Sequence, residues 1–382
     1  MRNHSPAAAA SAPRHAIPCF HGGVFFEAIG ERFDDLERRR DVINADVLDA
    51  WFPPAPGVLA TLREHLDWLV RTSPPTNCDG LMAAIAEARG VPSKCLLPGA
   101  GSSDLIFRAF NHWLTPASRV LLLDPTYGEY VHVCQHVIGC RVERLLLTRA
   151  TDYQVDLENL HRRLKLGDYD LAVIVNPNNP TGRHVPRPAL EETLTDLPGT
   201  TMAWIDEAYV DYIGANESLE RFATLRPNVV VCKSLSKAYA LSGMRAGYLC
   251  GSTETLAPLR AWTPPWVIGL AAQTAAMRAI QDPEYYQARY SETAALKQQL
   301  VDGLRRFQLD WHILDGKANF VLCHLPLGGP TAAEWVQRCR ARGLFVRDVA
   351  AMGTRLGPHV LRIAVKDAAT NDRMLAILRD LA

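Results

Sequence analysis

Residues 234–248 read SLSKAYALSGMRAGY, and they follow the apolar β-branched run VVV at 229–231. That run predicts a buried strand, and the small and hydroxylated residues after it predict a turn at the end of the strand, where α/β sheets bind ligands. Lys237 lies in this turn. A desolvated lysine has a lowered pKa, and its free amine is the form that makes Schiff bases with carbonyl compounds. Taken alone, the segment also fits a surface lysine beside a glycine-rich turn.

A hydroxyl and a guanidinium flank this lysine. Ser234 lies three residues before Lys237 and Arg245 eight after it, and the planar fork of a guanidinium suits a phosphate ester. The pattern S-x-S-K-x-x-x-x-x-G-x-R-x-G-Y resembles the active-site lysine segment of the fold-type I pyridoxal-phosphate (PLP) enzymes of aminotransferase class I/II. The resemblance implies PLP as cofactor, bound through Lys237, with Ser234 and Arg245 at its phosphate.

A second motif, NPNNPTG at 176–182, follows an apolar run that ends at Val175. Its prolines and glycine fix a tight turn that can hold an asparagine amide as a donor to a phenolate oxygen. By itself the motif also fits a plain loop. It is similar to the class I/II turn whose last asparagine contacts the ring hydroxyl of PLP, and the resemblance gives that role, with a part in binding the substrate, to Asn179.

A third motif, DEAY at 206–209, closes the apolar run 203–205. A carboxylate paired with the pyridine nitrogen keeps that nitrogen protonated, so that the ring acts as an electron sink. The resemblance assigns this role to Asp206 and a hydrogen bond to the ring oxygen to Tyr209. A lone aspartate here also fits a helix N-cap, but the chain keeps the family's order Asn179, Asp206, Lys237, which favours the functional interpretation.

Two further segments match positions around the cofactor. Residues 99–104, GAGSSD, form a small-residue turn at a predicted helix start, where backbone N–H groups and the helix dipole attract phosphate. Ser102 and Ser103 match the family's phosphate contacts, although a simple strand-to-helix turn has the same composition. Tyr127, in PTYGEY, matches the aromatic residue that stacks on the ring, although a core tyrosine fits equally.

Two arginines near the C-terminus match substrate positions. Arg362, in LRIA, matches the family arginine that binds the substrate α-carboxylate bidentately. Arg347, in GLFVR, matches a position used for a distal anion of the substrate in the histidinol-phosphate aminotransferase branch. An exposed arginine on a strand is the alternative for both.

The remaining pattern predicts an α/β fold. Apolar strands alternate with helices from about residue 96 to 250, which indicates a mostly parallel sheet covered on both faces. With the resemblance, we expect a fold-type I enzyme with three parts. Residues 1–56 form a disordered tail and an arm lying across a surface, residues 57–265 a large PLP-binding domain, and residues 266–382 a smaller α+β domain that begins with an interdomain helix.

The composition is that of an ordinary globular protein, with 48% hydrophobic residues and 41 basic against 41 acidic residues. This balance argues against nucleic acid or a membrane surface as partner, and no apolar run is long enough to span a membrane. The nine cysteines are scattered without metal-binding spacing, which favours reduced thiols and a cytoplasmic protein without a metal site. The resemblance adds a homodimer with small-molecule amino acid and keto acid substrates.

Within the class, the chain resembles the histidinol-phosphate aminotransferase and threonine-phosphate decarboxylase branch most. It is short, it carries HGG at 21–23, and Val346 precedes Arg347. It departs from the branch at residues 46–56 and 73–78, which replace segments that normally touch the substrate. The sequence leaves open which substrate is used and what residues 46–56 and 76–79 contact.

Transamination of an amino acid or an amino-acid-derived amine is the first functional interpretation, with Lys237 as the base that moves a proton at the substrate Cα. Decarboxylation, oxidation or cyclisation on the same fold is the alternative, because the outcome depends on which Cα bond is aligned with the ring. A non-catalytic regulator is a third hypothesis. The presence of Lys237, Asp206, Asn179 and Arg245 together opposes it.

Overall fold

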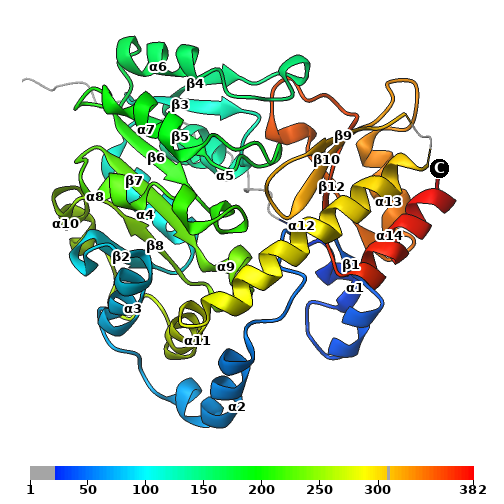
Figure 1. Cartoon of the computed structure of the whole chain (residues 1–382), viewed down its shortest axis with the longest axis horizontal. Coiled ribbons are helices and arrows are strands. Elements are labelled where there is room, and N and C mark those ends of the chain that lie inside the picture. Colours follow the sequence, from blue (N-terminus) through cyan, green and yellow to red (C-terminus); the bar gives the residue numbers. More distant parts are fainter. Residues whose placement is uncertain (1–21, 308–309) are drawn as a thin grey trace, which may run out of the picture.

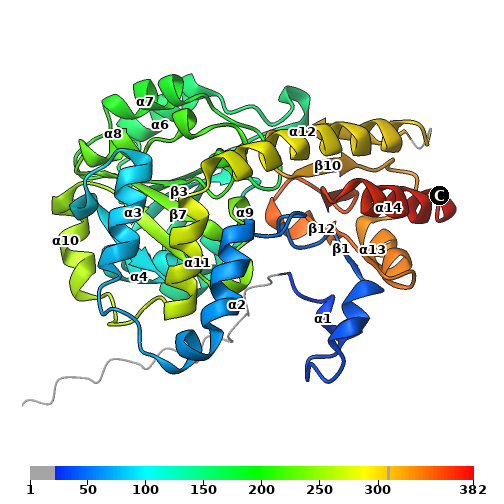
Figure 2. The same cartoon turned by 60° about the horizontal axis from the view of Figure 1, so that its bottom comes forward.

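The computed structural model describes residues 22–307 and 310–382. The tail predicted at the start of the chain, through residue 18, lies outside this described part. The chain folds into two lobes, one around a seven-stranded sheet and one around a four-stranded sheet. The long helix α12 (Pro283–Arg305) runs from the first lobe to the second (Figure 1, Figure 2).

The large lobe is built on a sheet with the order β2-β8-β7-β6-β5-β3-β4. The strands β7, β6, β5, β3 and β4 are parallel to one another, and β8 runs antiparallel to β7 and β2. The prediction of a mostly parallel sheet is therefore confirmed. The strands are β2 (Leu96–Gly99), β3 (Arg119–Asp124), β4 (Arg141–Leu146), β5 (Leu171–Val175), β6 (Met202–Asp206), β7 (Val229–Ser234) and β8 (Gly247–Cys250).

The central strands are apolar throughout because both faces of the sheet are covered. In β5, Leu171, Val173 and Val175 pack into one core cluster, and Ala172 and Ile174 pack into another on the opposite face. The first face is covered by α4 (Ser102–Trp113), α5 (Gly128–Val131) and α10 (Thr253–Ala261). The second is covered by α3 (Asp79–Arg89), α6 (Leu157–Leu166), α7 (Arg187–Thr195), α8 (Glu220–Thr224) and α11 (Leu270–Ile280). The carboxyl ends of the strands stay open to the small lobe.

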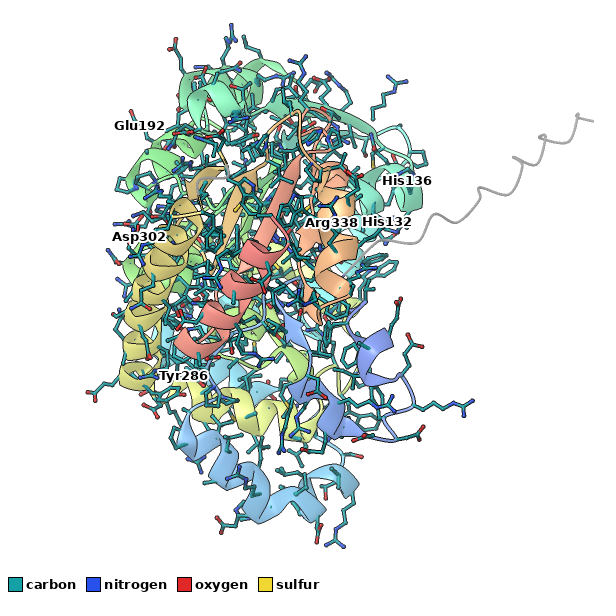
Figure 3. The ribbon with its side chains drawn as sticks, turned by 90° about the vertical axis from the view of Figure 1, so that its right-hand side faces the viewer. His132, His136, Glu192, Tyr286, Asp302 and Arg338 are labelled. Carbon is teal, nitrogen blue, oxygen red and sulfur yellow. The ribbon has the colours of Figure 1, made fainter. Side chains whose placement is uncertain are left out.

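The small lobe contains an antiparallel sheet with the order β12-β13-β10-β9. Figure 3 looks onto this lobe and shows α12, α14 and α13 side by side in front of the sheet, with Asp302 labelled on α12 and Arg338 on α13. The elements are β9 (His312–Asp315), β10 (Phe320–His324), α13 (Ala332–Arg340), β12 (Arg347–Asp348), β13 (Val360–Ala364) and α14 (Ala368–Asp380). Both predicted substrate arginines lie on this sheet, one on β12 and one on β13.

The N-terminal arm is tied to the small lobe. After α1 (Phe26–Ile29), the two-residue strand β1 (Ile43–Asn44) pairs in parallel with β11 (Leu344–Phe345). Ile43, Ala45 and Leu48 are buried in the core of the small lobe, which is deeper than expected for an arm on a surface. The pairing carries residues 46–49 to the side of the lobe that faces the large sheet.

The two helices that follow the predicted boundary at residue 265 pack against different lobes. Helix α11 packs against α2 (Pro56–Arg71) and α3 on the large lobe, whereas α12 packs against α14 in the small lobe. The division at residue 265 stays a prediction. No helix within residues 22–307 and 310–382 is both long enough and apolar enough to cross a membrane.

Candidate active site

One cavity of about 530 Å³ lies where the parallel strands of the large sheet end and the small lobe begins. Every residue predicted for the site lines it, although the residues come from both lobes and are spread over more than 250 positions of the chain. They are Ser102, Ser103, Tyr127, Asn179, Asp206, Tyr209, Ser234, Lys237, Arg245, Arg347 and Arg362. The motifs, far apart in the sequence, therefore lie around one cavity.

One end of the cavity is suited to bind an anion. Helix α4 begins at Ser102, directly after Gly101, whose positive φ of 86° favours glycine. A side chain on Gly101 would also collide with the guanidinium of Arg245. Arg245 donates to Ser236 Oγ at 3.1 Å. The free N–H groups of the first helical turn, the nearby serines and the guanidinium thus converge on one place, as a phosphate requires.

Lys237 lies on the short helix α9 (Leu235–Ala238), which begins where β7 ends. Its Nζ donates to Asp49 Oδ1 at 2.9 Å, and its side chain keeps 21% exposure. Burial lowers the pKa of the Lys237 amine, and the charge of Asp49 offsets part of that shift. This direction agrees with the role expected of Lys237, because a lowered pKa makes the neutral amine more accessible near physiological pH.

Asp206 ends β6 and is 5% exposed. Its carboxylate accepts hydrogen bonds from Tyr130 Oη at 2.7 Å and from the Ala208 amide at 3.0 Å. Trp204 Nε1 in turn donates to Tyr130 Oη at 2.9 Å. Burial raises the pKa of Asp206 to about 6, and the Tyr130 hydrogen bond opposes the rise. A buried carboxylate held in this way is ready to gain a cationic partner.

Replacing Tyr130 with phenylalanine tests this support of Asp206. The hydroxyl stabilises the charged carboxylate, so its removal should raise the pKa of Asp206 by about one unit. Cofactor should then bind more weakly at pH 6–7, with a smaller difference at pH 8.5. The check is the cofactor dissociation constant as a function of pH, with Tyr285→Phe as the control because the Tyr285 hydroxyl donates to the Pro53 carbonyl, away from Asp206. Identical pH profiles for Tyr130→Phe and the wild type would contradict the expectation.

The substrate side of the cavity is organised by Arg362. Its Nη1 donates to Asn179 Oδ1 at 2.6 Å, and its Nη2 donates to the Asp46 carbonyl at 2.9 Å. The guanidinium lies 5.6 Å from the centre of the Phe320 ring, against which Tyr209 also packs edge-on. Burial lowers the pKa of Arg362 to about 10, so the group stays cationic at neutral pH. The arrangement holds a fixed positive charge near Lys237.

Several residues of the site were missed by the sequence analysis. Glu129 Oε2 accepts hydrogen bonds from Ser103 Oγ at 3.0 Å and from Tyr127 Oη at 2.8 Å, which connects two predicted residues. Glu129 and Tyr130 belong to the same PTYGEY motif as Tyr127, and Ser236 belongs to the lysine segment, so their motifs could have signalled them. Asp49 has no such motif, and only the folded chain brings it to Lys237.

The cavity fits a phosphorylated aromatic aldehyde. A cradle for an anion, an aromatic side chain, a buried carboxylate and a lysine amine of lowered pKa all face one space. Residues 68–379 match the family model of aminotransferase class I and II. The chain belongs to this family, and it is a PLP-dependent aminotransferase.

The chain is similar to known aminotransferases in both sequence and structure. The chain is similar to histidinol-phosphate aminotransferase 1 of Cupriavidus pinatubonensis, with 31% identity over 80% of this chain and 79% of the relative. It is 29% identical to the aromatic amino acid aminotransferase of Streptomyces avermitilis over 85% of this chain and 87% of that one. The crystal structure of histidinol-phosphate aminotransferase from Sinorhizobium meliloti with PLP shares the fold, with a TM-score of 0.79, 23% identity and coverage of 91% of this chain and 95% of that chain.

Proposed function

We propose that this aminotransferase moves the amino group between a keto acid and an α-amino acid whose side chain is mainly apolar. The observation that carries the proposal is the position of Arg362, a buried cation in the same cavity as the Lys237 amine. A guanidinium of this kind is suited to an α-carboxylate. The apolar residues Phe26, Val47 and Leu48 of the arm line the same cavity.

The proposed roles rest on the positions of these residues around the cavity and on the family to which the chain belongs. Bound PLP supplies the electron sink for charge that develops at the substrate Cα. Ser102, Ser103, Ser234 and Arg245 would hold its phosphate, and Tyr127 would pack against its ring. Asp206 keeps the ring nitrogen protonated. Asn179 and Tyr209 donate hydrogen bonds to the ring oxygen.

Lys237 holds the cofactor and then moves the proton at Cα. Asn179 accepts from Arg362 through its oxygen, so its amide NH₂ is the end that can donate to the cofactor. Arg362 orients the substrate through its carboxylate, which fixes the Cα–H bond for Lys237.

The names of the relatives support a ring-bearing substrate. Their names refer to histidinol phosphate and to aromatic amino acids, which share a flat ring but differ in charge. The apolar wall formed by the arm suits the ring. We therefore place aromatic amino acids first among the candidate substrates.

The proposal includes a cytoplasmic homodimer. Trp262 and Trp266 are 57% and 55% exposed on the large lobe, and exposed aromatic residues of this size suit a subunit interface. The eight cysteines of the described residues are all buried free thiols, which suits a reducing compartment.

Replacing Arg362 with methionine tests the proposed substrate binding. We expect kcat/KM for phenylalanine to fall about 10²–10³-fold, because the α-carboxylate loses its buried partner. Reaction with phenethylamine, which lacks that carboxylate, should change far less. Arg338→Met, at an exposed position on α13, is the control. An equal loss for both compounds would show that Arg362 supports the structure and does not bind the carboxylate.

A further inference from the structure

Arg347, the second arginine on the substrate side of the cavity, already forms an ion pair within the protein. Arg347 and Arg362 lie directly opposite each other on β12 and β13, a placement of like charges that is unfavourable without a counter-charge. The Asp46 carboxylate forms an ion pair with the Arg347 guanidinium. The side chains of this pair are 10% and 6% exposed, respectively, for arginine and aspartate. The charge of Arg347 is thus neutralised from within the protein.

The arm also covers this ion pair. A side chain on Gly22 would collide with Val47 and would lie 2.6 Å from Arg347 Nη2 and 3.4 Å from Asp46 Oδ2. The main chain at Gly22 therefore lies against the guanidinium. An incoming anion would have to displace both Asp46 and this contact to reach Arg347.

A second carboxylate lies three residues further along the arm. Asp49 and Arg347 both line the cavity, and Asp49 Oδ1 lies 2.9 Å from Lys237 Nζ. Lys366 also lies close enough to interact electrostatically with Asp49. The remaining arginine, Arg245, belongs to the anion cradle at the other end. Among the described residues of the arm, Asp46 and Asp49 bring two negative charges to the substrate side, and the arm residues that line the cavity include no arginine or lysine.

We propose that the Asp46–Arg347 pair closes this enzyme to amino acids with a carboxylate or phosphate on the side chain, so that its amino acid substrate has an uncharged side chain. The inference rests on the proposed function, because it takes Arg362 as the partner of the α-carboxylate. It makes Asp46 a specificity-determining residue. A distal anion would meet the carboxylates of the arm before it met a free cation.

The test compares ligands that differ only in the distal charge. Isothermal titration calorimetry on the holoenzyme measures the affinity of glutarate and of its monoamide, neither of which carries a reactive amine. We expect the wild type to bind the monoamide about tenfold more tightly or better, since one carboxylate is repelled. Glutamate and glutamine, followed by the change in the visible absorbance of bound cofactor, should show the same order.

Asp46→Asn removes the charge and keeps the shape. It should shift the preference toward glutarate and glutamate by about tenfold or more, because the Asp46 carboxylate no longer neutralises Arg347 or repels a distal anion. The double variant Asp46→Asn/Arg347→Met should lose that gain, and Asp41→Asn, at an exposed position of the same arm, should behave as the wild type. If Asp46→Asn does not fold, the relative affinities of the wild type for glutarate and its monoamide still test the proposal.

Equal or tighter binding of the distal anions by the wild type would overturn the inference. So would an unchanged preference in folded Asp46→Asn. Failure of the proposed function has a different signature, because then neither glutamine nor an aromatic amino acid would change the cofactor absorbance, whatever the order of the two glutarate affinities.

Discussion

Replacing Lys237 with alanine is expected to abolish the covalent attachment of the cofactor and to lower the transamination rate by about 10³-fold or more, since the nucleophile and the proton-transfer group are lost together. The holoenzyme should lose the visible absorbance of the lysine-bound cofactor. After borohydride reduction of the wild type, peptide mapping should find the cofactor on the segment 234–248. The protein itself should stay folded, because the Lys237 side chain is partly exposed and bonds only to Asp49 among the described residues.

Lys366 offers the matched control for this assignment. It interacts with both Asp49 and Lys237, and burial lowers its pKa to about 8, so it is a second lysine of lowered basicity near the cavity. Lys366→Ala should keep the borohydride-reducible cofactor. A reducible adduct that persists in Lys237→Ala, or disappears in Lys366→Ala, would show that the assigned lysine is wrong.

Replacing Asp206 with asparagine is expected to have opposite effects on catalysis and on the stability of the apoenzyme. Without the negative charge, the ring nitrogen of the cofactor is no longer held protonated, and we expect kcat to fall about 10²–10³-fold, as for other lost electrostatic contacts to developing charge. Asparagine can still accept from Tyr130 and from the Ala208 amide, so the fold should survive. Rates under saturating cofactor measure this effect.

The stability effect follows from the pKa of Asp206, which burial raises to about 6 from an ordinary value of 3.8. A raised pKa means that the folded apoenzyme binds this proton more tightly than the unfolded chain. The apoenzyme therefore loses stability as the pH rises from 3.8, the ordinary pKa, to about 6, the pKa in the folded protein. Above about pH 6 the buried carboxylate is charged, and the whole loss of stability applies. Asp206→Asn avoids this cost of burying the charged carboxylate, so its apoenzyme should be more stable than the wild type at pH 8 by about 3 kcal/mol.

Urea unfolding of both apoproteins at pH 4 and pH 8 measures this difference. The two proteins should converge at the acidic pH. A variant that is less stable than the wild type at pH 8 would mean that Asp206 carries an unrecognised structural role. Wild-type kcat in Asp206→Asn would show that the Asp206 carboxylate does not take part in catalysis.

The sequence was sufficient for the parts of the site that are local in the chain. Asp206 ends a buried strand, Asn179 and Lys237 lie within four residues after one, and the carboxyl ends of neighbouring parallel strands meet at one edge of a sheet. Strand periodicity therefore placed them together before any contact was known. The apolar run that ends at Val175 is β5, and the apolar runs 203–205 and 229–231 lie within β6 and β7.

The sequence did not predict the contacts of the arm. Asp49 reaches Lys237 across 188 positions of the chain, and Asp46 reaches Arg347 across an even longer separation. The two-residue strand β1 sets both contacts, and a strand of this length shows no periodicity. The four-residue strand β9 was also not predicted, because its sequence shows no strand pattern. Contacts of this kind depend on the packing of an irregular segment against a distant lobe, which local residue preference does not encode.

Arg347 shows the consequence for function. Its position alone suggested a site for a distal anion, but its charge has meaning only together with its neighbours. Asp46 supplies the neighbour, and it lies in the segment where the chain departs from the resembling branch. Substrate preference is therefore the property for which the folded structure adds most to the sequence.

The central claim is that this site carries out transamination, and a single half-reaction tests it most directly. The holoenzyme is mixed with phenylalanine without any keto acid, and the cofactor spectrum, keto acid, carbon dioxide and oxygen are followed together. We predict conversion to the pyridoxamine form with one phenylpyruvate released per site, and recovery of the starting spectrum when a keto acid is added. Return of the aldehyde form with carbon dioxide released or oxygen consumed, and no keto-acid dependence, would contradict the account.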